Sequence, residues 1–175
     1  MNASAELPTM LQQAVDQHGR TLDELSEGAP QLVVFLRHGG CTFCRQVLAD
    51  LQAQRSRIEA QGLGIVLVHM DRDERAADLF ARYGMQDVAR IGDPEQRLYA
   101  AFELRRGRWW QLLSPLVWCK GFVACIVRGH GMGRLRGDVR QLPGSFIVHR
   151  RRILRAHRPD TPADRPDFCQ LLDPT

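Results

Sequence analysis

One stretch constrains the fold of this chain more than any other. It consists of the apolar run 32–36, a turn at Gly39 and Gly40, and a helical pattern that opens on Cys41 and Cys44. The apolar run contains two valines and no charge, which is typical of a strand covered on both faces. Glycine lets the backbone turn sharply after it. We therefore predict a strand, a tight loop and a helix with Cys41 at its first turn and Cys44 one turn inside.

The position of Cys41 has chemical consequences. A thiolate, rather than a thiol, is the nucleophile, and the positive end of a helix favours an anion. Arg37, His38 and Arg45 are close in sequence and would add positive potential. The i, i+3 spacing places Cys41 and Cys44 on one side of the helix, where they can close a disulfide. We expect Cys41 to attack and Cys44 to resolve the product.

A Cys-x-x-Cys pair has a second reading, as half of a zinc site or as a structural feature. Cys119 and Cys125 could supply the other half, although five residues between them within an apolar segment are poor spacing for a zinc knuckle. Redox chemistry is favoured because the pair follows a strand and opens a helix. Cys119, Cys125 and Cys169 are expected to be buried, inert thiols.

The length of 175 residues suits one well-buried domain, which we place at residues 20–175 after an N-terminal helical extension at residues 1–19. The net charge is +4, but only Lys120 is a lysine and the arginines are scattered. The one dense run, Arg150 to Arg152, reads as a solvated hairpin turn. No nucleic-acid partner is expected, because such a surface clusters its basic residues among aromatic ones.

No segment predicts a membrane span or a signal peptide. The first twenty residues lack a basic start followed by an apolar core, and the most apolar stretch, residues 112–127, is interrupted by Pro115, Lys120 and Gly121. We expect a cytoplasmic protein. In that reducing compartment a Cys-x-x-Cys pair is more often catalytic than structural.

The remaining chain alternates strands and helices. Helices are predicted at 7–18, from a cap at Asp71 or Asp73, and from Asp93-Pro94 onward, with Asp93 as the cap. Strands are predicted at 64–70 and 88–91, and a hairpin at 145–149 and 152–156. A parallel pair extended by an antiparallel hairpin, with helices on both faces, is an α/β sandwich.

Three separated segments resemble one known group. The segments 35–45, 137–146 and 155–166 are similar to the thioredoxin superfamily, and more narrowly to the peroxiredoxin-like AhpC/TSA group that includes selenoprotein L-like redox proteins. The resemblance implies a thioredoxin-like α/β fold with a central mixed sheet flanked by helices on both faces. It also implies a thiol-disulfide or peroxide-reducing oxidoreductase with no metal and no organic cofactor.

The resemblance assigns supporting roles as well. Pro143 would be a cis proline packed against the cysteine pair, where its missing N–H leaves room for an incoming strand-like substrate. The chain departs from the Pro-x-x-x-Thr/Ser-x-x-Cys pattern of typical peroxiredoxins, whether Cys41 or Cys44 is aligned with the cysteine of that pattern. Arg37, His38 and Thr42 would then replace parts of the usual peroxide pocket.

Two functional hypotheses follow. The first is an antioxidant enzyme that reduces hydroperoxides or protein disulfides with electrons from a thioredoxin or glutathione system. The alternative is a thioredoxin-fold binding module whose Cys41 and Cys44 are structural or hold zinc, without turnover. Exposed aromatic residues near the cysteine loop would mark a homodimer face.

Overall fold

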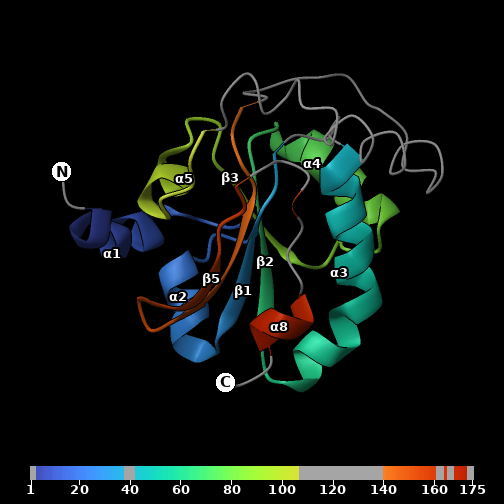
Figure 1. Ribbon diagram of the computed structural model, residues 1–175, viewed down its shortest axis with the longest axis horizontal. Coiled ribbons are helices and arrows are strands. Elements are labelled where there is room, and N and C mark those ends of the chain that lie inside the picture. Colours follow the sequence, from blue (N-terminus) through green and yellow to red (C-terminus); the bar gives the residue numbers. More distant parts are fainter. Residues whose placement is uncertain (1–2, 38–41, 107–139, 161–163, 165–167, 173–175) are drawn as a thin grey trace.

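The computed structural model describes residues 3–37, 42–106, 140–160, 164 and 168–172, and a five-stranded mixed sheet forms its centre (Figure 1). In spatial order the strands are β3 (Ala89–Gly92), β2 (Gly64–His69), β1 (Gln31–Phe35), β4 (Gly144–His149) and β5 (Arg152–His157). β1, β2 and β3 run parallel, whereas β4 is antiparallel to both β1 and β5. The predicted parallel pair extended by a hairpin is confirmed.

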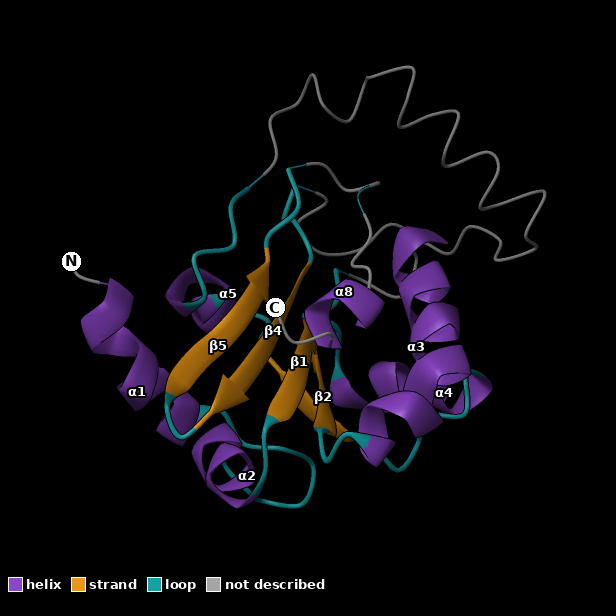
Figure 2. Ribbon diagram, turned by 60° about the horizontal axis from the view of Figure 1, so that its bottom comes forward, coloured by secondary structure: helices purple, strands orange, loops and turns teal. Residues whose placement is uncertain are grey.

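Helices cover both faces of the sheet (Figure 2). On one face lie α1 (Ala3–Gln13), α2 (Leu22–Gly28) and α5 (Arg97–Ala101), and on the other lie α3 (Thr42–Ala60), α4 (Asp73–Arg82) and α8 (Phe168–Leu172). The predicted α/β class, with a mixed sheet between two helical layers, is confirmed. Among the described residues, no helix has both the length and the apolar character that crossing a bilayer requires.

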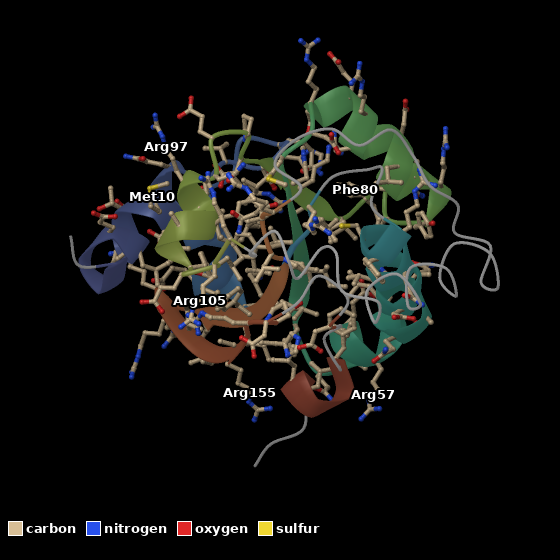
Figure 3. All side chains as sticks on the ribbon, turned by 45° about the horizontal axis from the view of Figure 1, so that its top comes forward. Met10, Arg57, Phe80, Arg97, Arg105 and Arg155 are labelled. Carbon is tan, nitrogen blue, oxygen red and sulfur yellow. The ribbon has the colours of Figure 1, made fainter. Side chains whose placement is uncertain are left out.

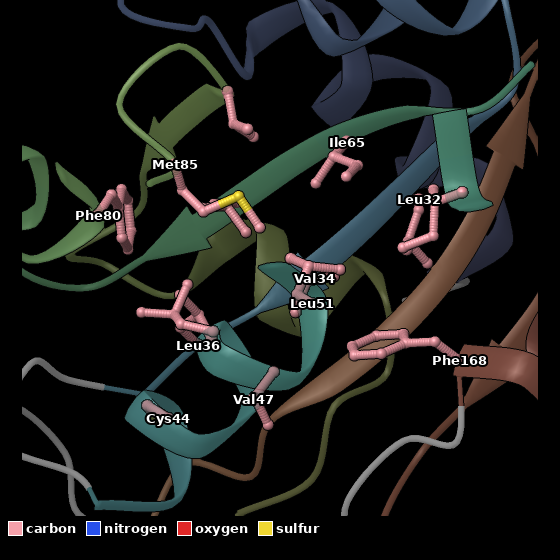
Figure 4. Close-up of a cluster of buried hydrophobic side chains, with 14 of the residues drawn as sticks. Leu32, Val34, Leu36, Cys44, Val47, Leu51, Ile65, Phe80, Met85 and Phe168 are labelled. Carbon is pink, nitrogen blue, oxygen red and sulfur yellow. The ribbon is translucent and has the colours of Figure 1, made fainter. Parts of the chain in front are cut away.

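The central strand β1 is buried throughout and divides the interior into two cores. Leu32, Val34 and Leu36 contribute to the α3-side core, which also contains Phe168 of α8 (Figure 4). Val33 and Phe35 contribute to the α5-side core. Successive side chains of a strand point to opposite faces, so an apolar run without alternation is what a doubly covered strand needs.

The first helix differs from its prediction, because α1 spans Ala3–Gln13 rather than residues 7–18. The carboxylate of Asp16 accepts the backbone N–H groups of His18 and Arg20, both at 2.9 Å, and this turn competes with a continued helix. Leu11 of α1 is fully buried in the α5-side core. The division into an extension at 1–19 and a domain at 20–175 stays a prediction.

The helices that follow β1 and β2 end at glycines with left-handed backbones. Gly62 has φ +76° after α3, and Gly84 has φ +66° after α4, as glycines beyond helix ends often do. The predicted cap of α4 is wrong. Arg72 is the N-cap and makes no side-chain hydrogen bond there. The carboxylate of Asp73 is instead engaged by Arg90 from β3, at 3.0 Å.

The helix predicted at Asp93-Pro94 begins later, at Arg97, yet Asp93 caps it. Its carboxylate accepts the N–H groups of Arg97, Leu98 and Tyr99 at 3.0, 2.8 and 3.2 Å. Gln96, with φ 60°, turns the chain between the cap and the helix. The charge of Asp93 therefore satisfies three donors that would otherwise have no partner within the helix.

The hairpin turn is held against α2. Arg150 and Arg151 both have positive φ, 47° and 61°, which is the geometry of a two-residue turn that suits strand twist. The Arg151 guanidinium pairs with the Asp23 carboxylate, at 2.6 Å for the shortest contact, and Arg150 N–H donates to Ser26 O at 3.1 Å. These contacts give the basic run a local structural role and offset the cost of the turn conformation.

Candidate active site

Cys44, the second cysteine of the predicted pair, lies at the carboxyl edge of the parallel strands. Cys41 and His38 lie outside the described residues. Arg37 lies two residues beyond the end of β1, and the backbone of Thr42 begins α3. Residues 38–41 thus connect β1 to the amino end of α3, and the strand-then-helix order is the one that the sequence predicts.

Cys44 lies in the first turn of α3, rather than a full turn inside the helix. Its thiol is buried, with 3% of the residue exposed, and its Sγ accepts the backbone N–H of Arg37 at 3.2 Å. A hydrogen bond to sulfur and the positive end of a helix both favour a thiolate, whereas burial opposes it. Figure 4 shows Cys44 beside Leu36, at one end of the α3-side core.

A small cavity of about 10 Å³ lies next to this thiol. Its polar lining comes from Arg37, Cys44, His69 and Asp71, and its apolar lining comes from Leu36 and from α4 through Ala76, Leu79 and Phe80. A cavity of this size holds about one water-sized probe. Leu36, Arg37, His69 and Asp71 converge here because β1 and β2 are parallel neighbours, with Phe35 opposite Val68.

His69 is a site residue that the sequence reading missed. It is 3% exposed, its Nδ1 is 3.1 Å from Asp71 O, and its Nε2 is 3.6 Å from Asp73 Oδ1. Burial lowers the pKa of His69, against a smaller opposing effect of the Asp71 carbonyl and the Asp73 charge. The imidazole is therefore neutral at neutral pH. The sequence could have indicated this residue, because His69 ends an apolar strand that is predicted to lie beside β1.

Replacing His69 with glutamine should change how stability depends on pH. Because the folded pKa is lowered, the unfolded chain takes up a proton at this residue first as the pH falls. The neutral, buried imidazole therefore contributes fully to the free energy of unfolding of the wild type above the unfolded pKa. This contribution is lost as the pH falls below that pKa, by at most about 1.4 kcal/mol per pH unit. Urea unfolding between about pH 7.5 and pH 5 should give wild-type and His69→Gln curves that diverge only on the acid side. Curves parallel over the whole range would contradict this assignment.

Tyr99 is the second residue that the sequence reading missed as part of the site. It is fully buried on α5, and its hydroxyl donates to Leu36 O, with a longer contact of 3.4 Å to Val68 O. Burial raises the pKa of the Tyr99 phenol, and the nearby Cys44 adds to this effect. Tyr99 therefore stays protonated, as a hydrogen-bond donor, at the pH values where thiols titrate.

Pro143 reaches the same edge of the sheet, but the predicted cis bond is wrong. Gly144, the next residue, pairs with Phe35 at the end of β1, and the described residues contain no cis peptide bond. A trans peptide bond before proline is lower in free energy than a cis one. The preceding segment is already tied in place, because Leu142 N–H donates to Arg105 O at 3.2 Å and Gln141 Nε2 donates to Leu104 O at 3.3 Å.

Other predicted features lie apart from this edge or outside the described residues. Cys119 and Cys125 belong to the undescribed segment 107–139, and of Cys169 only the backbone, in α8, is described. A larger hollow of about 320 Å³ lies between α1 and α5, and Met10 and Arg97, both labelled in Figure 3, are among the residues that line it. None of the described residues that line it is a cysteine, and it is distant in the fold from the amino end of α3 (Figure 1).

Comparison with known proteins identifies relatives of the chain. A family model described as AhpC/TSA antioxidant enzyme matches residues 50–161, so the matched span begins after Cys44. Peroxiredoxin-like 2A of Mus musculus is 26% identical over 152 residues, which cover 86% of this chain and 67% of that protein. The chain thus spans about two thirds of the length of this relative.

Solved structures show the same fold. A cysteine-to-serine mutant of peroxiredoxin Q from Xanthomonas campestris has a TM-score of 0.58 at 15% identity, covering 83% of this chain and 78% of that chain. A yeast mitochondrial 1-Cys peroxiredoxin, studied for thiol resolution via glutathione/thioredoxin systems, has a TM-score of 0.61 at 8% identity, covering 91% and 68%. These similarities confirm the predicted thioredoxin-like fold.

Proposed function

Because this chain belongs to the AhpC/TSA antioxidant enzyme family, we propose that it is a thiol-dependent redox enzyme that cycles Cys41 and Cys44 between dithiol and disulfide. The observation that carries the proposal is the setting of Cys44. Its sulfur lies in the first turn of a 19-residue helix, at the carboxyl edge of parallel strands, and accepts a backbone N–H. This setting favours an anionic sulfur. Cys44 must be a thiolate to attack the sulfur of Cys41.

The proposed cycle divides the labour between the two sulfurs. The Cys41 thiolate attacks an oxygen of the hydroperoxide: an S–O bond forms, the O–O bond breaks, and the alcohol or water leaves with a proton. The Cys44 thiolate then attacks the sulfenic sulfur, so an S–S bond forms and water leaves. With a protein disulfide, Cys41 forms a mixed disulfide and Cys44 displaces the substrate thiol. The burial of Cys44 supports its role as the second sulfur to react, because a thiol with 3% exposure is a poor first contact for a large substrate.

Four further residues are proposed to support the reacting sulfurs. Arg37, His38 and Thr42 flank Cys41 in the sequence, and their residue types would supply positive potential and a hydroxyl donor. Pro143 lies just before β4, at the edge where an extended substrate would approach, and it offers no N–H that would compete for pairing.

The electron donor is proposed to be a thioredoxin or glutathione system, which would return two electrons and two protons to the disulfide. The yeast relative in fold, whose thiol resolution uses these systems, supports this class of donor. A reducing cytoplasm would keep such a donor in its reduced form and the two cysteines in the dithiol state. No metal or organic cofactor is required by this chemistry.

A parallel steady-state assay tests the proposal. Purified full-length protein should reduce at least one of hydrogen peroxide, an alkyl hydroperoxide and an insulin-type disulfide when thioredoxin or glutathione recycling is supplied. Mild peroxide should consume two thiols per chain on the way to the disulfide. Stoichiometric zinc in the purified protein, together with no turnover on any of the three substrates, would overturn the proposal in favour of a binding module.

A further inference from the structure

The peptide unit between Leu36 and Arg37 is hydrogen-bonded at both ends within the candidate site. Its carbonyl oxygen accepts the Tyr99 hydroxyl, and its N–H group donates to the Cys44 sulfur at 3.2 Å. A peptide unit is planar and rigid, so a constraint on its oxygen also sets the direction of its N–H. Two hydrogen bonds in series thus connect Tyr99, on α5, through the peptide unit after β1 to the sulfur on α3.

We propose that Tyr99 is a positioning residue for Cys44: its hydroxyl holds and polarises the Leu36–Arg37 peptide unit, whose N–H stabilises the Cys44 sulfur as an anion. The effect on turnover rests on the proposed function, because it matters for catalysis only if Cys44 must ionise to resolve an adduct. Hydrogen bonds in series strengthen one another, by about 10–30% per bond. The geometry places that gain on the Arg37 N–H, which donates directly to the sulfur.

The surroundings of Tyr99 keep it in this role. The ring packs edge-on against Phe35, with centroids 4.9 Å apart, and the Tyr99 N–H donates to Asp93 at 3.2 Å. The phenol therefore approaches Leu36 O from a fixed direction. Burial raises the pKa of the Tyr99 phenol, so the hydroxyl stays protonated and remains a hydrogen-bond donor while the thiol titrates.

Other groups around Cys44 act on the same sulfur and have to stay constant in a test. Arg37, beyond the end of β1, brings positive charge, and Asp71, beyond the end of β2, brings negative charge to the shared cavity. His69 is the third ionisable group lining that cavity, and Asp93 acts on Tyr99 from the start of α5. Altering only the Tyr99 hydroxyl leaves these four side chains in place.

The first test measures the Cys44 thiol directly, without turnover. In a Cys41→Ser background, the far-ultraviolet thiolate absorbance of Cys44 is obtained as the difference from the Cys41→Ser/Cys44→Ser protein. Tyr99→Phe should raise the Cys44 pKa by about 0.5, because the N–H donor is no longer polarised. Tyr83→Phe, the matched control on the only other tyrosine, should leave that pKa unchanged.

A second test keeps the shape of Tyr99 in case the phenylalanine variant folds poorly. Because the chain has two tyrosines, 3-fluorotyrosine supplied to a Tyr83→Phe protein enters only at position 99. The more acidic phenol is a stronger donor and should lower the Cys44 pKa relative to unlabelled protein. An unchanged pKa in the fluorinated protein would overturn the proposal, even if the enzyme turns over. Absence of turnover with a shifted pKa would overturn the proposed function and leave the role of Tyr99 intact.

Discussion

Replacing Cys41 with serine should lower turnover on every substrate by on the order of 10³-fold or more, because a serine hydroxyl is not ionised near neutral pH and cannot replace the thiolate as nucleophile. The fold should survive, since the substitution changes one atom of a small side chain. Steady-state reduction of hydroperoxides and of an insulin-type disulfide measures the loss, and circular dichroism checks the fold. Cys169→Ser, at a thiol predicted to be inert, should match the wild type.

The companion variant separates the two sulfurs. Cys44→Ser should still react with one equivalent of peroxide or disulfide at Cys41, but it should stop there, leaving a sulfenic acid or a mixed disulfide that mass spectrometry detects. If Cys41→Ser kept the fast first reaction and Cys44→Ser lost it, the assigned roles would be exchanged. Equal first-step rates in both variants and the wild type would remove this pair from the chemistry.

Replacing Phe35 with alanine should destabilise the protein by about 3–5 kcal/mol, the largest stability effect expected in the described part of the chain. Phe35 is fully buried, and its ring contacts those of Tyr99, Phe102 and Phe146 at centroid distances of 4.9, 4.9 and 5.5 Å. These partners come from α5, from the residue that follows it, and from β4, so the cavity left behind cannot close by moving one element. Urea unfolding of wild type and variant measures the difference.

An exposed position on the same sheet provides the control. Leu154 of β5 is 54% exposed, and Leu154→Ala should change the free energy of unfolding by no more than about 0.5 kcal/mol. A loss of less than about 1 kcal/mol for Phe35→Ala would show that the aromatic cluster is not the centre of the α5-side core. Such a result would also weaken the argument that Tyr99 is held in a fixed place.

The elements that local pattern predicted well are those whose signal is contained in a few neighbouring residues. The apolar runs of β1 and β2 and the alternation of the hairpin are of this kind, and so are the glycines after α3 and α4. The errors occur where a side chain competes for the backbone. Asp16 ends α1 early, and Asp93 caps a helix that begins four residues later, at Arg97. Neither outcome is visible in periodicity, because the same carboxylate can cap a turn or a helix.

The sequence by itself determined that a buried strand leads into a helix that carries Cys44 near its amino end, within an α/β fold of one mixed sheet. Only the tertiary structure brought His69 to the cavity beside Cys44, and Tyr99 to the peptide unit that bonds its sulfur. The physical reason is the range of the interactions. Strand and helix patterns arise from burial along neighbouring residues, whereas these contacts depend on parallel pairing of β1 with β2 and on the packing of α5 against the sheet.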